Sequence, residues 1–181
     1  MEKLQKLDIV KELAGNKTVL LLMPSLEYND VIVKIAEELS GKSVCYVTLN
    51  KTYDSLKELF NKKKVDMSNI VFVDAISKTI KKTPSQTDSC YFVSSPGALT
   101  ELSLVISKFL KHNFEYVIFD SVTNLMIYEK RDSVIKFVSY IINKVEASQS
   151  RAVFYSLNIK EHESTINELS MFSSKVIDLT D

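Results

Sequence analysis

The stretch LLLMPSLEYNDVIVKIAEEL, residues 20–39, contains one example of the unit from which the whole fold is predicted to be built. It begins with an uninterrupted apolar run, the kind of segment that forms a strand buried on both faces. Pro24 then opens a turn, and from Val31 to Leu39 the apolar residues recur at the spacing of one helix face. The stretch therefore predicts a buried strand, a turn and a covering helix, which is the repeating unit of a parallel α/β sheet.

The same alternation continues along the whole chain. Strands are predicted at 18–23, 43–49, 70–74, 90–94, 116–120, 152–156 and 175–179, and helices at 29–40, 53–62, 98–111, 133–148 and 163–172. No linker rich in proline, glycine or serine divides them, so we expect a single domain over 1–181. The predicted fold is α/β, with three layers and a mainly parallel central sheet flanked by helices.

Composition narrows the class of protein. Lysine and arginine number 23, as do aspartate and glutamate, so no overall charge draws the chain to nucleic acid or to an anionic membrane. Residues 1–15 predict an amphipathic helix, and no apolar run approaches the ~20 residues of a membrane span. Cys45 and Cys90 lie in apolar strands and are expected to be buried thiols. We therefore expect a cytoplasmic protein that binds neither a metal nor a membrane, and nucleic acid is disfavoured.

The turn after the first strand invites comparison with the phosphate-binding pattern GxxxxGK[ST], which falls on residues 23–30. Neither glycine is present, and Tyr28, Asn29 and Asp30 replace the second glycine, the lysine and the hydroxyl residue. A carboxylate at Asp30 would repel a phosphate 4 Å away by roughly 4 kcal/mol at an effective dielectric of 20. We expect a site that does not hold ordinary nucleotides, with Asn29 or Asp30 capping the helix instead.

Asp120 ends the apolar strand YVIFD, 116–120, in the form of the acid that helps to hold magnesium in P-loop enzymes. Two interpretations are open. Asp120 is either a residual metal ligand or a strand-end acid that caps the turn containing Ser121, and the loss of the phosphate loop favours the second. The polar segment 77–89 predicts an exposed connection.

The run SPGALTELSLVISKFLKHNFEYVIFDSVTNLMIYEKRDSVIKFVSYIINKV, residues 95–145, resembles the archaeal KaiC-like branch of the RecA superfamily. The likeness lies in the segments LTELS, VIFDS, LMIY and INK, and it extends more loosely to CYVTLNKTYDSLKELF and IVFVDAIS. The resemblance implies a RecA-like P-loop fold that binds ATP between subunits. It also implies an acidic general base just after the second strand, where this chain has Asn50 and Lys51.

These observations favour a non-catalytic, KaiC-like pseudo-ATPase that regulates or scaffolds, in signal transduction for example, through a protein partner or a homo-oligomer. No catalytic residue and no cofactor is expected, although weak binding of ATP and magnesium stays open. The alternative is a ligand-binding protein or enzyme that reuses the crevice at the strand ends. The residues of that crevice, or of the former nucleotide site, are Pro24, Ser25, Tyr28, Asn29, Asp30, Asn50, Asp120 and Ser121, with Asn158 as a further polar contact.

Overall fold

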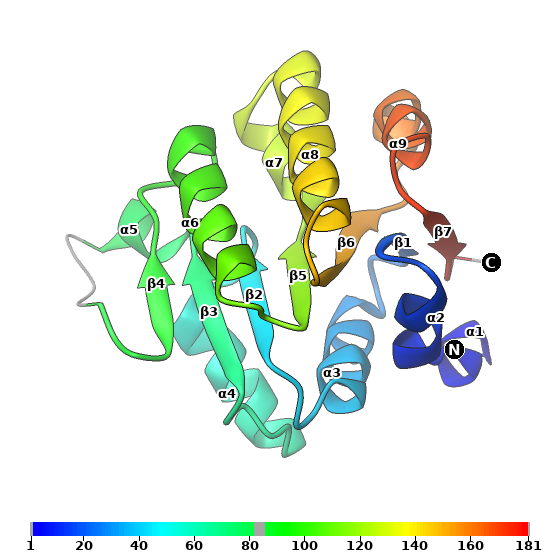
Figure 1. Cartoon of the computed structure of the whole chain (residues 1–181). Helices are drawn as coiled ribbons and strands as arrows, with labels where there is room; N and C mark the ends of the chain where they lie inside the picture. Colours follow the sequence, from blue (N-terminus) through cyan, green and yellow to red (C-terminus); the bar gives the residue numbers. More distant parts are fainter. Residues whose placement is uncertain (1, 82–85, 181) are drawn as a thin grey trace.

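The computed structural model describes residues 2–81 and 86–180, and it has a central sheet of seven parallel strands between two layers of helices (Figure 1). The strands are β1 (Thr18–Met23), β2 (Val44–Thr48), β3 (Ile70–Asp74), β4 (Cys90–Phe92), β5 (Tyr116–Asp120), β6 (Arg151–Leu157) and β7 (Lys175–Asp178). The helices are α1 (Glu2–Lys6), α2 (Ile9–Gly15), α3 (Tyr28–Glu38), α4 (Tyr53–Lys63), α5 (Ser77–Ile80), α6 (Leu99–Lys111), α7 (Val122–Tyr128), α8 (Arg131–Glu146) and α9 (Glu163–Ser170), with a 3₁₀ turn at Lys160–His162.

The strands lie in the order β4-β3-β2-β5-β6-β1-β7. Each neighbouring pair is parallel, and the register places Thr18 beside Ala152, Val44 beside Tyr116, and Val19 beside Lys175. Because all strands run the same way, their carboxyl ends meet along one edge of the sheet. Ligands of open parallel sheets bind beyond that edge, so it is the place to look for a site.

Each face of the sheet has its own hydrophobic core. Leu21 of β1 packs with residues of α2, α3 and α4, whereas its neighbour Leu20 packs with residues of α6, α8 and α9 on the opposite face. This separation follows from the two-residue period of a strand. It also explains why the strands are apolar throughout: β1, β2 and β5 are buried at every position.

The ends of the helices show where sequence patterns mislead. The amphipathic segment 1–15 is two helices rather than one, because Asp8 adopts an extended backbone and its side chain accepts a hydrogen bond from the Lys11 N–H, at 2.9 Å. Such a cap starts a new helix. Helix α4 ends where predicted, since Lys64 takes the left-handed conformation, with φ of 61°. Helix α7 was not predicted at all.

The segment 77–89, expected to be an exposed connection, is exposed at most of its described positions, although Ser77–Ile80 form the short helix α5 and positions 82–85 lie outside the described residues. Tyr91 is 40% exposed, and the Lys108 ammonium lies 5.7 Å from the centre of its ring. Tyr91 sits on the edge strand β4, where one face of the strand meets solvent.

Neither α3 nor any other helix within the described ranges is long and apolar enough to cross a bilayer. Cys45 and Cys90 are free and buried, as expected.

Phe60 offers a test of the core on the α4 side. Its ring is fully buried and lies 6.0 Å from the ring of Tyr46 and 6.4 Å from that of Phe72. We expect Phe60→Ala to lower the free energy of unfolding by about 3–5 kcal/mol, because it leaves a cavity among packed rings. Phe172→Ala is the matched control, since Phe172 is 45% exposed; it should cost less than about 1 kcal/mol. Urea unfolding measures both, and equal losses would contradict this packing.

Candidate functional site

The most unusual polar group in the molecule is the carboxylate of Asp120, at the carboxyl end of the central strand β5. Asp120 is fully buried. The hydroxyl of Tyr28, the first residue of α3, donates a short hydrogen bond to its Oδ1. The hydroxyl of Tyr46, in β2, donates to its Oδ2 at 2.6 Å. Each carboxylate oxygen thus has its own tyrosine, and the two tyrosines come from different elements.

The buried position changes how these groups ionise. Burial raises the pKa of Asp120 to about 6, against the opposing effect of the two tyrosine hydrogen bonds and of the Lys51 charge. Burial and the nearby Asp120 carboxylate raise the pKa of Tyr28 and Tyr46 well above the usual range. Both hydroxyls therefore stay protonated at neutral pH and remain hydrogen-bond donors.

Three more side chains lie near Asp120 and its two tyrosines. Tyr155, in β6, is fully buried, and its hydroxyl has no hydrogen-bond partner within the described part of the chain. The Asp120 carboxylate is close enough to raise the pKa of Tyr155 as well. The ammonium of Lys51 lies 5.8 Å from the centre of the Tyr28 ring. A hydrogen bond from Asn50 is the one contact that lowers the pKa of Tyr28.

The structure corrects two expectations about these residues. Helix α3 begins at Tyr28, so Asn29 and Asp30 lie inside its first turn rather than at its cap. Asp30 instead forms an exposed ion pair with Lys63, at 3.7 Å. Asp120 does not cap the following turn, because its carboxylate faces the two tyrosines. That cap is Ser121, whose hydroxyl accepts from the Asn124 N–H at 3.3 Å and begins α7.

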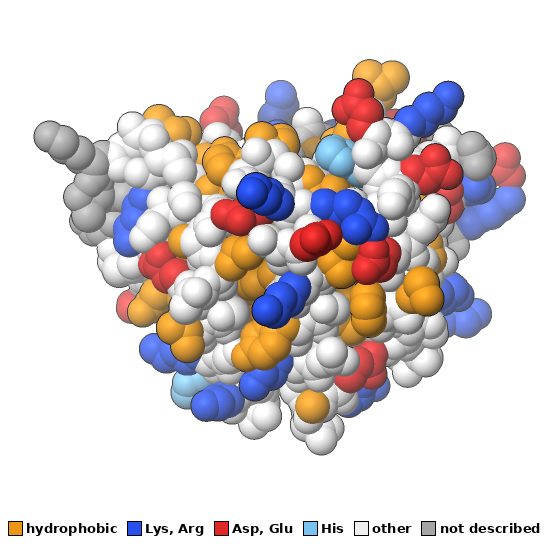
Figure 2. All heavy atoms as spheres, turned by 90° about the horizontal axis from the view of Figure 1, so that it is seen from above, with side chains coloured by type: hydrophobic (Ala, Val, Ile, Leu, Met, Phe, Trp, Pro, Cys, Tyr) orange, Lys and Arg blue, Asp and Glu red, His pale blue; other side chains and the backbone are white. Residues whose placement is uncertain are grey.

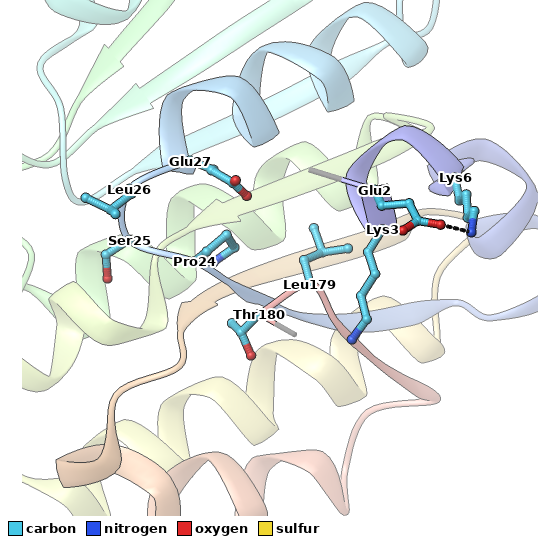
Figure 3. Close-up of a pocket in the computed structure, with 9 residues that line it drawn as sticks. All are labelled: Glu2, Lys3, Lys6, Pro24, Ser25, Leu26, Glu27, Leu179 and Thr180. Atoms are coloured by element: carbon cyan, nitrogen blue, oxygen red, sulfur yellow. Dashed lines mark hydrogen bonds and ion pairs between the residues drawn. The ribbon is translucent and has the colours of Figure 1, made fainter.

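Pro24 and Ser25 lie in a different place, at the largest cavity beside the strand ends. This pocket holds about 690 Å³, between the turn after β1, the end of β7 and helix α1 (Figure 3). Its lining residues are Glu2, Lys3, Lys6, Pro24, Ser25, Leu26, Glu27, Leu179 and Thr180. In Figure 3 the turn 24–27 lies on one side and Lys3 with Leu179 on the other, with the Glu2–Lys6 ion pair at the rim. Neither Tyr28 nor Asp120 lines the pocket, so the expected crevice residues divide into two groups.

The arrangement limits what Asp120 can do. Each of its carboxylate oxygens accepts a hydrogen bond from a tyrosine hydroxyl, and the side chain has no exposed surface. A ligand or cation could reach it only after Tyr28 moved away. In the described ranges, no three His, Cys, Asp or Glu side chains gather closely enough to hold a metal ion.

Sequence reasoning identified Tyr28 and Asp120 but did not join them, and it missed Tyr46 and Tyr155. The available signal was the strand pattern itself. Tyr46 and Tyr155 each stand in an apolar strand run, VCYV and AVFYS, and the hydroxyl of a buried tyrosine usually finds a hydrogen-bond partner. Two such strands beside a strand ending in aspartate could have suggested a buried tyrosine cluster.

Comparison with known proteins places the chain in a family. A family model described as a family of unknown function, DUF7090, matches residues 4–181, and the chain belongs to that family. None of the curated proteins matches the sequence. Among solved structures, the fold is similar to that of the KaiC-like protein PH0186 from the hyperthermophilic archaeon Pyrococcus horikoshii OT3. The TM-score is 0.67 at 13% sequence identity, over 92% of this chain and 74% of that one. The predicted α/β class with a RecA-like fold is thus confirmed.

Tyr28→Phe tests the hydrogen bond that Tyr28 donates to Asp120. The change leaves Oδ1 of Asp120 buried with one donor fewer, and we expect a loss of about 1–3 kcal/mol in the free energy of unfolding at pH 8. The loss should be smaller at pH 5, where the carboxyl group, with a pKa of about 6, is largely neutral. Tyr53→Phe is the control, because the Tyr53 hydroxyl has no hydrogen bond to the residues that the structure describes. Equal effects of the two variants in urea unfolding would contradict the assignment.

Asp120→Asn tests the raised pKa. The folded chain holds the Asp120 proton more tightly than the unfolded chain, so the stability that this group contributes is complete below its ordinary pKa of 3.8 and is lost as the pH rises through about 6. The asparagine does not titrate. We therefore expect the stability of the variant relative to the wild type to increase by about 2 kcal/mol from pH 4 to pH 8. Urea unfolding at both pH values measures it, and a constant difference would show an unshifted pKa.

Proposed function

We propose that this chain is a non-catalytic module of KaiC-like type, whose nucleotide site has degenerated and which acts through a protein partner or a homo-oligomer. A regulatory or scaffolding role, as in signal transduction, fits such a module. As part of the same proposal, the chain is a single cytoplasmic domain of archaeal type that needs no cofactor. Its basis is a RecA-like fold combined with side chains that close the position where the fold would hold phosphate.

The bond between Tyr28 and Asp120 is the observation that carries the proposal. Tyr28 occupies the position of the second glycine in the phosphate-binding pattern, where a backbone without a side chain is needed. Its ring instead reaches across to the one acid that matches the family, and its hydroxyl donates to that acid. Phosphoryl transfer needs a phosphate cradle, a metal and a positioned water, so an acid held in this way cannot support it.

The charges nearby support the same proposal. Asp30, at the position of the magnesium-binding hydroxyl, forms an exposed ion pair with Lys63. Asn50 and Lys51 stand where the family carries an acidic base, and both approach Tyr28. The two residues that replace the acidic base therefore lie beside Tyr28, the residue that replaces the second glycine.

The deciding experiment is isothermal titration of the purified chain with ATP and magnesium, together with an assay of phosphate release. We expect neither heat of binding nor release of phosphate from the wild type, and the same two results from Asp120→Ala. Turnover in the wild type that disappears in Asp120→Ala would overturn the proposal, because Asp120 would then be catalytic. Binding without turnover would keep the chain non-catalytic but would make it a nucleotide sensor.

A second candidate function is ligand binding in the 690 Å³ pocket. That volume lies in the range of ~300–1,000 Å³ that is usual for small-molecule sites. The pocket also lies at the carboxyl ends of β1 and β7, where parallel sheets bind ligands. Nuclear magnetic resonance with a library of small molecules tests it. A ligand should shift the amide signals of Leu26 and Thr180, and a library without such shifts would remove this candidate.

Binding of nucleic acid has no comparable support. On the face seen in Figure 2, acidic and basic side chains alternate rather than gather by sign. Phosphate-driven binding needs a basic surface and weakens as salt rises. A filter-binding assay at two salt concentrations should therefore show no salt-dependent retention of single-stranded or double-stranded DNA.

A further inference from the structure

The two edges of the sheet are finished in different ways. At the β4 edge, the outward backbone groups belong to Cys90 and Phe92. The Thr87 side chain accepts from the Cys90 N–H at 2.9 Å, and the Thr87 N–H donates to the Cys90 carbonyl at 3.3 Å. The Gln86 amide accepts from the Phe92 N–H at 3.0 Å and donates to the Phe92 carbonyl at 3.3 Å. All four groups are satisfied, so the chain itself closes this edge.

The β7 edge is left open. The Leu179 N–H donates to the Leu22 carbonyl of β1 at 2.9 Å, so Leu179 and the alternate residues before it turn their backbone groups inward. Val176 and Asp178 turn theirs outward. The Lys3 ammonium reaches the Asp178 carbonyl, at 3.3 Å. The Val176 N–H, the Val176 carbonyl and the Asp178 N–H find no partner among residues 2–81 and 86–180.

The open edge is apolar on one face and charged on the other. Val176 pairs with Leu20, so it faces the α9 side of the sheet. On that side Met171, Phe172 and Val176 are 82%, 45% and 38% exposed and follow one another along the chain into β7. On the opposite face, Lys175 forms an ion pair with Glu12, at 2.6 Å. We call Met171, Phe172, Val176 and the outward groups of β7 the open edge.

We propose that the open edge binds an extended strand of a partner protein, which adds to the sheet beside β7. Unpaired strand edges take up such segments through backbone hydrogen bonds, and side chains at alternate positions provide the specificity. The bound strand carries apolar residues at every second position, against Met171, Phe172 and Val176, and polar residues between them, level with Lys175 and Glu12. This surface gives the partner proposed above a place to bind, and the inference rests on that proposed function.

The contrast between the edges argues for the choice of edge. A strand added at β4 would have to displace Gln86 and Thr87 from four hydrogen bonds. A strand added at β7 displaces nothing from the Val176 groups and satisfies three groups that lack partners. The apolar side chains beside them lose solvent contact in the same step.

The test uses a short synthetic peptide, acetylated and amidated, in which valine alternates with threonine and lysine stands at each end. Its control has the same sequence with every backbone nitrogen between the terminal lysines methylated, so that neither edge of the peptide can donate a backbone hydrogen bond to a strand. We expect the first peptide to bind and to slow hydrogen exchange at the Val176 and Asp178 amides, while the Lys175 and Ile177 amides change little. The methylated peptide should do neither.

Val176→Pro is the matching variant. The Val176 N–H points away from β1, so proline removes no hydrogen bond of the β1–β7 ladder, while it takes a donor from the open edge. We expect peptide affinity to fall at least about tenfold, whereas Val176→Thr, which keeps the N–H, should fall much less. If Val176→Pro does not fold, the hydrogen-exchange measurement on the wild type with the two peptides still tests the inference.

Three results would overturn the inference. They are no binding of the alternating peptide, binding that leaves exchange at Val176 and Asp178 unchanged, and self-association of the chain that Val176→Pro abolishes. The last would make a second copy the occupant. None of them depends on ATP, so failure here is distinguishable from failure of the proposed function, which the titration with ATP decides.

Discussion

A carboxylate without access to water is the constraint around which the centre of this molecule is arranged. Asp120 ends β5 in the middle of the sheet, with no exposed surface, and charge in such a place is costly unless donors surround it. Two tyrosines supply those donors, one from β2 and one from the start of α3. They tie the helix that follows the first strand to the strand that lies two places away across the sheet. The same contact leaves the Asp120 carboxylate without exposed surface.

The elements of the fold were accessible from sequence because the strands are buried on both faces. β1 is apolar after Thr18 and β5 is apolar before Asp120, and turns bound both runs, so the strand limits Thr18–Met23 and Tyr116–Asp120 agree with those predicted. Helix ends were harder, since they depend on single side chains. Asp8 divides the first fifteen residues into two helices, and Ser121 starts α7 in a stretch whose apolar residues resemble a continued strand. The pattern of apolar residues alone does not reveal either of these helix boundaries.

The site was predictable in its members but not in their contacts. Residues 23–30 contain neither glycine nor lysine, which led us to expect no ordinary phosphate loop there, and Asp120 marks the strand end. That Tyr28 should bond to Asp120 depends on the distance between α3 and β5, which arises only when β5 and β6 insert between β1 and β2. Long-range order of this kind has no local signature. The division between the tyrosine cluster and the 690 Å³ pocket follows from the same geometry.

The side chain of Gln86 has a consequence for how the sheet can grow. Its amide satisfies both backbone groups of Phe92, as one more residue of a neighbouring strand would. Because the chain satisfies its own β4 edge, only the β7 edge presents unpaired backbone groups to another molecule. Copies of the chain therefore cannot stack without end by joining the β7 edge of one sheet to the β4 edge of the next.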